Sequence, residues 1–382
     1  MKTRKLRKNK RQKGGQLRSV PVSTRPVPRP VPRPVLRPVP RPSPRPSPRP
    51  APAPGSNRLH LLTRIVGSNP VGFGGDGGPA ISANLYYPSN VAVDRSGNVY
   101  IADKWNHRIR RVAASTGIIT TVAGNGNGGL SGDGGPAINA RIEYPSGIVI
   151  DRSGNLLIAD TQNHRIRRVA LNTGIITTVV GTIEGFSGDG SSATTAKLSF
   201  PSGLALDSSG NMYIGDTNNN RIRRVDAVTN NITTIAGYGW HILGDEIGGF
   251  NGDNKPATTA RLNNPTEVVV DRNRNVFISD FYNHRIRRVD ASGTITTVAG
   301  DGSTDSSVSM PYPMGLAIDN NNLYMANGTL RRLSLRTGII NVVTGYSNTT
   351  FPVNSMVFDS SGNMIIAHIG NNSISKISGP FM

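Results

Sequence analysis

Runs of alternating apolar and polar residues, separated by turns rich in glycine and aspartate, recur along most of the chain. The run PSNVAVD, which starts at Pro88, returns as PSGIVID from Pro145, PSGLALD from Pro201, PTEVVVD from Pro265, PMGLAID from Pro313 and, more loosely, PVNSMVFD from Pro352. A period of two predicts β-strands, and glycine-containing turns between the runs predict hairpins. A complete unit holds four such runs and no long helical pattern. The six units therefore predict an all-β fold, a six-bladed β-propeller with four antiparallel strands per blade.

The last unit lacks its fourth run before the chain ends. Its strands are expected at 355–359, 364–368 and 373–378. The segment LLTRIVG at 61–67 matches the IITTVAG-type run that completes other units. As the outer strand of the last blade, this N-terminal segment would close the ring and leave no unpaired sheet edge.

Charge divides the 382 residues into two parts. Residues 1–58 carry +17 of the net +20, because they hold 17 of the 43 basic residues and none of the 23 acidic ones. The same segment holds 15 of the 27 prolines. We therefore predict a disordered, basic and proline-rich arm at 1–58 and a nearly neutral propeller at 59–382.

The arm combines a basic cluster at 2–18 with a tetrapeptide of the type PVPR or PSPR that repeats six times between Arg25 and Arg49. Proline at every second position predicts polyproline II from about 25 to 54, and the absence of a PxxP motif argues against an SH3 ligand. We expect the arm to contact a polyanion such as nucleic acid; the alternative is a stiff spacer. The residues expected to bind the polyanion are Lys5, Arg7, Lys8, Lys10, Arg11, Lys13, Arg29, Arg33, Arg37, Arg41 and Arg45.

Composition also excludes several classes of protein. The chain has no cysteine, which rules out disulfides, cysteine-ligated metals and thiol catalysis. No apolar stretch approaches 18 residues, and no apolar segment follows the basic N-terminus as it would in a signal peptide. The sequence therefore favours a soluble protein without a transmembrane segment. Its location stays open, with an intracellular site favoured and nuclear import as one option.

The regular units carry the phrases IADKWNHRIRRV, IADTQNHRIRRV, IGDTNNNRIRRV and ISDFYNHRIRRV. These phrases resemble NHL repeats, and the resemblance extends over about 59–382, with the fifth and sixth units departing from it. The resemblance implies a β-propeller. In that family propellers serve as ligand sensors of receptor kinases or as modules that bind RNA or protein, and propeller relatives include lyases and hydrolases.

In each of the four regular units an aspartate precedes an arginine by five residues. The fifth unit replaces both residues, by Asn327 and Thr329, and the sixth replaces both by His368 and Ser373. Joint replacement predicts structural ion pairs, because the loss of one partner would leave a buried charge. The predicted pairs are Asp103–Arg108, Asp160–Arg165, Asp216–Arg221 and Asp280–Arg285.

Three histidines, His107, His164 and His284, share one repeat position, which asparagine fills in two other units. Copies related by rotation of the ring lie on different blades, so they cannot share one metal ion. We expect a structural or surface role for these histidines. The sequence predicts no metal site and no cofactor.

Two groups of residues are candidates for binding. The first strand of each unit borders the central channel, and the residue two positions after its proline varies between units. At this position Asn90, Glu267 and Asn354 are expected to meet in the channel, where they could polarise a substrate or hold a cation. Glycine-rich loops between blades contribute the second group, which comprises Asp76, Asp133, Asp189 and Asp253 together with Tyr238 and Trp240. For these loops a packed connector is the alternative to a ligand site.

The sequence favours a non-enzymatic, monomeric propeller. One face would bind a protein or another macromolecule while the arm contacts the polyanion. A second hypothesis is a lyase or hydrolase acting in the channel, although paired acid and base groups are absent there. A third is RNA binding by the propeller face itself, against which the aromatic content of 5% counts.

Overall fold

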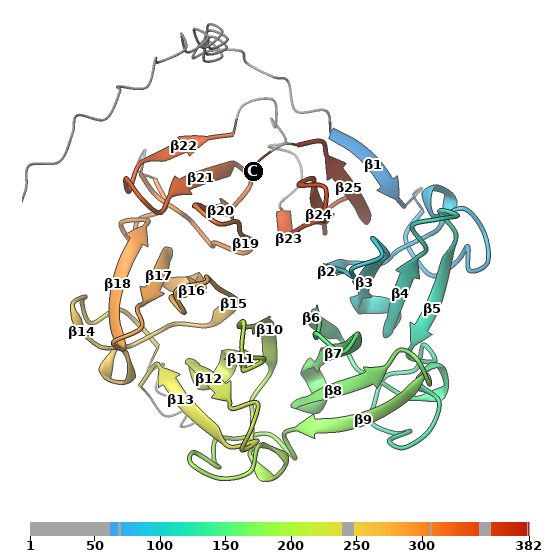
Figure 1. Ribbon diagram of the computed structural model, residues 1–382, viewed down its shortest axis with the longest axis horizontal. Helices are drawn as coiled ribbons and strands as arrows, with labels where there is room; N and C mark the ends of the chain where they lie inside the picture. The colour runs from blue at the N-terminus through green and yellow to red at the C-terminus, as the bar shows by residue number, and fades with distance from the viewer. Residues whose placement is uncertain are drawn as a thin grey trace, which may run out of the picture. The chain divides into compact units, whose positions relative to one another are not determined.

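The computed structural model describes residues 62–67, 70–238, 248–305, 308–343, 353–379 and 381. These residues form six antiparallel sheets arranged around a central axis (Figure 1). Each sheet has four principal strands, and the first strand of each borders the centre. The predicted six-bladed propeller is therefore confirmed, whereas the predicted arm at 1–58 lies outside the described residues.

The strands of each blade follow one another from the centre to the rim. Blade 1 contains β2 (Pro88–Val93), β3 (Val99–Asp103), β4 (Arg108–Val112) and β5 (Ile119–Ala123). Blade 2 contains β6 (Pro145–Ile150), β7 (Asn155–Asp160), β8 (Arg165–Ala170) and β9 (Ile175–Val180). Blade 3 contains β10 (Pro201–Leu206), β11 (Met212–Asp216), β12 (Arg221–Val225) and β13 (Ile232–Ala236).

The second half of the ring is less regular. Blade 4 contains β15 (Pro265–Val270), β16 (Val276–Asp280), β17 (Arg285–Val289) and β18 (Thr294–Ala299), with the short β14 (Lys255–Pro256) added outside β18. Blade 5 contains β19 (Leu316–Ile318), β20 (Asn322–Ala326), β21 (Leu330–Ser334) and β22 (Ile340–Val342). Blade 6 contains β23 (Val353–Phe358), β24 (Met364–His368), β25 (Ser373–Ile377) and β1 (Leu62–Val66).

The ring closes as the sequence predicts. Strand β1, from the start of the described chain, pairs antiparallel with β25, so that Leu62 lies opposite Ile377. The last blade thereby obtains its outer strand from the opposite end of the sequence. This pairing gives β25 a neighbour on both sides.

Short 3-10 helices form two sets. The first set lies between blades and comprises η1 (Ala80–Ser82), η3 (Ala137–Asn139), η5 (Ala193–Thr195) and η7 (Ala257–Thr259). The second joins the second and third strands of four blades and comprises η2 (Lys104–Asn106), η4 (Thr161–Asn163), η6 (Thr217–Asn219) and η8 (Phe281–Asn283). Each helix of the second set ends at a residue in the left-handed region, where the chain turns into the third strand.

The aspartate that ends each strand-one phrase builds the following hairpin. In blade 1, Asp94 accepts hydrogen bonds from the backbone of Ser96 and Asn98 and from the Asn98 amide. Gly97 adopts a φ of 81°, which a residue with a Cβ rarely adopts. This local chemistry explains why the phrase recurs at each first hairpin.

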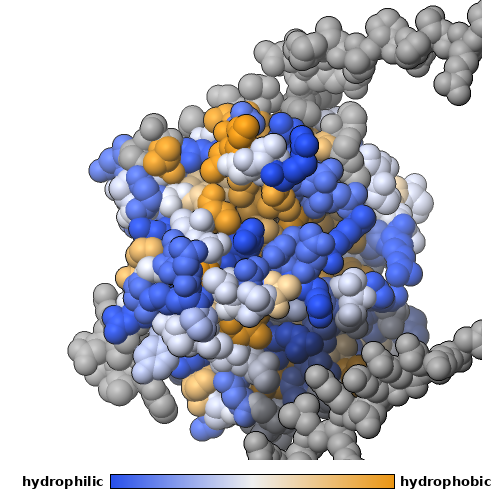
Figure 2. All heavy atoms as spheres, turned by 60° about the vertical axis from the view of Figure 1, so that its left-hand side comes forward, coloured by the Kyte–Doolittle hydropathy of each residue, from blue (hydrophilic) through white to orange (hydrophobic). Residues whose placement is uncertain are grey.

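The core lies between adjacent blades. One apolar cluster combines Ile109 and Ala123 of blade 1 with Ile148, Ile158 and Ile176 of blade 2. Hydrophilic side chains cover most of the flank in Figure 2, and apolar side chains there form separate patches. Among the described residues, no helix has the length and hydropathy needed to cross a membrane.

Candidate binding site at the mouth of the central channel

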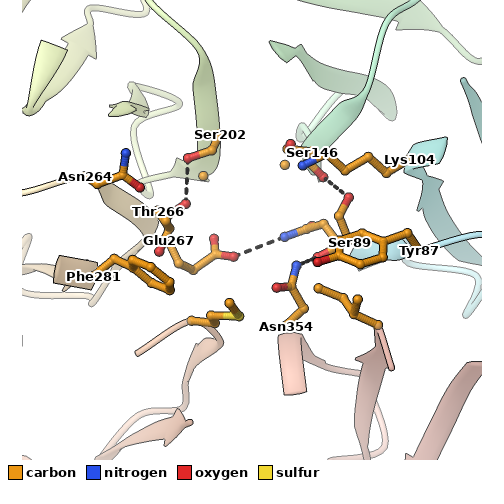
Figure 3. A pocket seen from close by; sticks show the side chains of 15 residues that line it. Tyr87, Ser89, Lys104, Ser146, Ser202, Asn264, Thr266, Glu267, Phe281 and Asn354 are labelled. Atoms are coloured by element: carbon orange, nitrogen blue, oxygen red, sulfur yellow. Dashed lines mark hydrogen bonds between the residues drawn. The ribbon is translucent and has the colours of Figure 1, made fainter. Parts of the chain in front are cut away.

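One end of the central channel forms a polar cavity of about 200 Å³. The residues that line it are Tyr87, Ser89, Asn90, Lys104, Ser146, Gly147, Ser202, Gly203, Asn264, Thr266, Glu267, Phe281, Met314, Asn354 and Ile369. The three predicted channel residues, Asn90, Glu267 and Asn354, are all among them. Figure 3 labels Glu267 and Asn354. The structure thus brings together side chains that lie as many as 264 positions apart in the sequence, between 90 and 354.

Asn90 and Glu267 meet across the channel. Asn90 lies on β2 of blade 1 and Glu267 on β15 of the opposed blade 4 (Figure 1). The Asn90 Nδ2 donates to Glu267 Oε2 at 3.1 Å, while Asn90 Oδ1 accepts from the Ile148 backbone at 3.2 Å. Asn354 donates instead to the Ser89 carbonyl. The hydrogen bond between opposed blades holds the Glu267 carboxyl at the centre of the ring.

Burial strongly perturbs this carboxyl. Glu267 is only 9% exposed, and the loss of hydration raises its pKa to about 8, although the Val268 backbone and Asn90 both donate to it. No described carboxylate or ammonium group is a cause of this shift. Glu267 is therefore mainly a neutral carboxylic acid at pH 7.

Lys104 is a lining residue that the sequence analysis missed. It begins η2 directly after Asp103, at a position that Thr161, Thr217 and Phe281 fill in the other regular blades. Burial lowers the pKa of Lys104. Within the described part of the chain, its ammonium has no ion pair and no hydrogen bond of its own. A comparison of the residue that follows each strand-two aspartate would have revealed this exception.

Aromatic side chains flank the cavity on two sides. Tyr87, Trp105, Tyr282 and Tyr312 among them are exposed, and the others are half-buried. The first ledge comprises Tyr86, Tyr87, Trp105 and Tyr144, and the Trp105 ring lies 5.2 to 5.9 Å from the other three. The second ledge comprises Phe281, Tyr282 and Tyr312, with ring centroids 4.9 to 6.4 Å apart. Tyr87 and Phe281 also line the cavity, so each ledge is continuous with it. Trp105 is 45% exposed and Tyr282 is 53% exposed, which leaves both available to a partner.

The repeated histidines join neighbouring blades on this face. The backbone N–H of Tyr144 donates to His107 Nδ1 at 3.3 Å, and Phe200 and Tyr312 donate in the same way to the histidines of the preceding blades. Asparagine accepts the equivalent bond at two further junctions, from Asn264 to Asn220 and from Tyr87 to Asn372. These histidines thus have structural contacts. At the five described junctions the donor is the residue directly before the strand-one proline.

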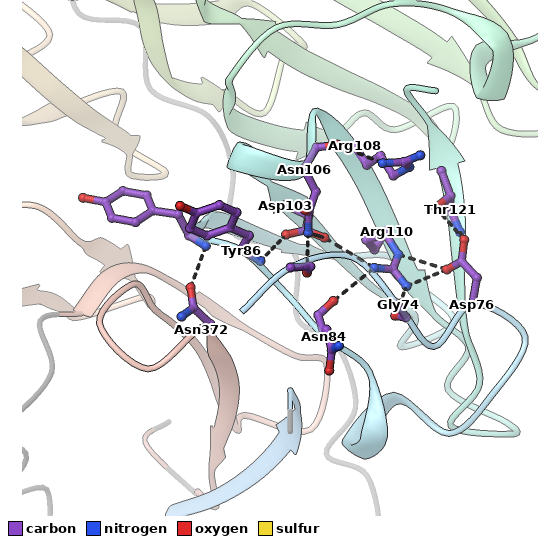
Figure 4. A network of polar contacts seen from close by, with 12 residues as sticks. Gly74, Asp76, Asn84, Tyr86, Asp103, Asn106, Arg108, Arg110, Thr121 and Asn372 are labelled. Atoms are coloured by element: carbon purple, nitrogen blue, oxygen red, sulfur yellow. Dashed lines mark hydrogen bonds and ion pairs between the residues drawn. The ribbon is translucent and has the colours of Figure 1, made fainter. Parts of the chain in front are cut away.

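The strand-end aspartates pair with a different arginine from the one predicted (Figure 4). In blade 1 Asp103 Oδ2 lies 3.4 Å from Nη1 of Arg110, two residues beyond Arg108. The same shift holds for Asp160 with Arg167, Asp216 with Arg223 and Asp280 with Arg287. The predicted pairings of these aspartates with Arg108, Arg165, Arg221 and Arg285 are therefore wrong. Those four arginines donate to backbone carbonyls instead.

Strand geometry explains the difference. Arg108 lies directly opposite Asp103 in the β3–β4 register, but it is the first residue of β4. Its guanidinium stacks 3.8 Å over Phe73 and donates to the Asn125 carbonyl at 2.8 Å. Arg110 is the diagonal neighbour on the same strand, and its fully buried side chain extends back to the aspartate.

The loop aspartates anchor the inter-blade loops through the same arginines. Arg110 bonds Asp76 at 2.6 Å, and the Thr121 hydroxyl donates to the other oxygen of Asp76, also at 2.6 Å. The arginines Arg167, Arg223 and Arg287 bond Asp133, Asp189 and Asp253 at 2.6 to 2.9 Å. Each buried arginine thus connects a blade to its preceding loop. Tyr238 is 54% exposed, and Trp240 lies outside the described residues.

The buried carboxyls are strongly desolvated. Burial raises the pKa of Asp103, Asp160, Asp216 and Asp280 to about 6, and hydrogen bonds from arginine, asparagine and the backbone oppose that rise. These four aspartates remain mainly ionised at pH 7 and paired with arginine. Their chemistry is used within the scaffold.

The opposite end of the channel is apolar. A cavity of about 330 Å³ is lined largely by valine, isoleucine, leucine and methionine side chains of the first strands. Asn90 and Glu267 line both cavities, so their hydrogen bond lies between them. Among the described lining residues, Lys104 belongs to the first cavity alone, and the second cavity has no basic side chain.

Comparison with known proteins agrees with this architecture. An NHL-repeat family model matches residues 85–112, 198–225 and 262–289, and a teneurin NHL-domain model matches 126–187. NHL repeat-containing protein 2 from Bos taurus is 30% identical over 296 residues. That match covers 67% of this chain but only 40% of the bovine protein, so the chain spans less than half the length of that relative.

Solved structures share the fold at low sequence identity. An auxiliary nutrient binding protein from Bacteroides ovatus superposes with a TM-score of 0.59 at 14% identity, over 84% of this chain and 76% of that one. A gluconolactonase from Xanthomonas campestris superposes with a TM-score of 0.56 at 12% identity, over 84% and 91%. Both binding and enzymatic propellers thus share this architecture. The chain belongs to the NHL-repeat β-propellers.

Proposed function

We propose that this protein is a non-enzymatic binding module whose partner contacts the face around the channel mouth. The observation that carries the proposal is the pair of exposed aromatic ledges on opposed blades, each continuous with the polar cavity. Aromatic side chains with large exposed areas are the residues that dominate protein interfaces when they become buried. The regular aspartates and arginines of the repeats are already engaged within the scaffold.

Substitution of the ledges tests this proposal. The full-length protein carrying Trp105→Ala and Tyr282→Ala should lose at least tenfold in affinity for a partner identified by its binding to the wild type. Tyr238→Ala is the matched control, because Tyr238 is equally exposed but lies outside both ledges. If the control loses as much affinity as the ledge variant, or if the ledge variant loses none, the partner binds a surface other than the ledges.

For the arm we propose contact with a polyanion such as nucleic acid. Its 17 basic residues without any acidic residue support this role. Binding should weaken steeply with salt, because each neutralised phosphate releases counterions. Deletion of residues 2–49 should abolish nuclease-sensitive binding and leave the ledge partner bound. Nucleic-acid binding retained after this deletion would favour recognition by the propeller face.

A second candidate function is catalysis in the channel by a lyase or hydrolase. Glu267 supports it, because a buried carboxyl that is neutral at pH 7 has the protonation state of a general acid. Among the described lining residues, however, Glu267 is the one carboxyl, so no second carboxyl pairs with it as acid and base. A turnover abolished by Glu267→Gln, with ledge binding retained, would favour this candidate over the binding module.

A further inference from the structure

The channel mouth holds two chemically active groups that the scaffold does not use. The first is the Lys104 ammonium. It lies at the edge of the cavity, near Ser146 (Figure 3), and no described carboxylate lies within ion-pair distance. A half-buried ammonium without a counter-charge is unfavourable, because it has lost hydration and gained no replacement. Burial accordingly lowers the pKa of Lys104.

The second group is the Glu267 carboxyl. The groups that bond to it, the Asn90 amide and the Val268 backbone, are both donors. A neutral carboxylic acid also carries a proton of its own, which a ligand oxygen in the cavity can accept.

We propose that the channel mouth binds a carboxylate group, with the Lys104 ammonium as its counter-charge and the Glu267 acid as a second hydrogen-bond donor. An anion suits this site better than a cation, because the ammonium repels cations. The cavity of about 200 Å³ accommodates an acid of the size of benzoate, since a 150 Å³ cavity already admits benzene. This proposal goes beyond the proposed function, because the cavity can bind a carboxylate whether or not the aromatic ledges bind a macromolecule.

Calorimetric titration of the full-length protein tests the proposal. The ligands are acetate, butyrate and benzoate, and each is compared with its neutral amide at matched ionic strength. The carboxylates should bind at least tenfold more tightly than the amides at pH 7. Lys104→Met should remove this preference, whereas Lys197→Met should keep it, because Lys197 is half-buried outside the cavity. The wild-type comparison of acid with amide needs no variant, so it decides the question even if Lys104→Met fails to fold.

The pH dependence separates the two groups. Lys104 is the basic residue and Glu267 the acidic residue among the described lining, and the Tyr87 phenol is the remaining titratable group. Carboxylate affinity of the wild type should fall as the pH rises through about 8, because Glu267 ionises and repels the ligand. In Glu267→Gln this fall near pH 8 should disappear, since the substituted amide does not ionise.

Two sources of the carboxylate remain to be distinguished. Acetyl-trialanine with a free C-terminus, compared with its amidated form, reports whether the site accepts a chain terminus. Binding of the free-acid peptide more tightly than acetate would assign the site to a peptide end, and the reverse would assign it to a small free acid. Equal affinity for acids and amides, unchanged binding in Lys104→Met, or calcium binding in place of carboxylates would each overturn the proposal.

Discussion

Arg110 should stabilise the first blade far more than Arg108, although the two residues look equivalent in the repeat. The Arg110 side chain is fully buried and donates to Asp76, to Asp103 and to the carbonyls of Gly74 and Asn84 at 2.6 to 3.4 Å. Arg110→Met removes the cation and leaves the buried Asp103 carboxylate without a counter-charge. Breaking a buried pair in this way costs about 3–5 kcal/mol.

The matched substitution, Arg108→Met, should cost much less. Arg108 is half-buried, and its guanidinium bonds two backbone carbonyls and stacks over Phe73. The loss of these contacts costs about 1–2 kcal/mol, because the two carbonyls are neutral and no buried charge loses its partner. The two single variants therefore differ by about 1–4 kcal/mol, although both replace arginine by methionine on the same strand.

Urea unfolding followed by intrinsic fluorescence measures both effects. The midpoint should fall strongly for Arg110→Met and slightly for Arg108→Met, with unchanged m-values. Adding Asp103→Asn should restore part of the stability lost in Arg110→Met, since it removes the unpaired charge and completes a double-mutant cycle. Equal midpoints for the two single variants, or a larger loss for Arg108→Met, would refute this account and restore the pairing predicted from spacing.

Three further predictions concern the channel and the blade junctions. Glu267→Gln should be as stable as the wild type at pH 4 and more stable at pH 9, by up to about 5 kcal/mol in urea unfolding. The reason is that a carboxyl whose pKa is raised in the folded state destabilises that state as the pH rises from about 4.5 through about 8. His107→Asn should gain stability relative to the wild type as the pH falls from 8 to 5. Burial lowers the pKa of His107, and protonation of its Nδ1 removes the acceptor for the Tyr144 backbone N–H. Parallel profiles of stability against pH for the two proteins would contradict this prediction. Gly147→Ala should lower the thermal midpoint by the equivalent of about 1–3 kcal/mol, since a Cβ there would overlap the Ser202 carbonyl of the next blade. Gly78→Ala is the control and should change the midpoint less, because a Cβ at Gly78 meets no atom closer than 3.4 Å.

The repeat made the fold predictable from one sequence. Six copies of the strand-one phrase give the number of blades, and the orphan run at 61–67 gives the closure, because both depend only on backbone pattern. The partner of Asp103 was not predictable in the same way. A spacing of five identifies the residue opposite on the next strand, but side-chain direction and the position of Asp76, 34 residues before Arg110, decide the contact.

The channel mouth was partly predictable, and the reason lies in symmetry. A ring of identical blades presents the same group six times, so it cannot orient one asymmetric ligand by itself. Positions where the copies agree, such as the buried arginines of the four regular blades, serve the scaffold. Positions where they differ break the symmetry, and two of these, at Lys104 and Glu267, place opposite chemical functions on opposed blades around one cavity. The position of Glu267 follows a recurring proline and is predictable from the repeat, whereas Lys104 stands out only beside Thr161, Thr217 and Phe281, the residues that follow the other three strand-two aspartates. In a propeller, the channel-facing positions at which the internal repeats differ are therefore the places to look for binding chemistry, because the residues that the repeats share build the scaffold.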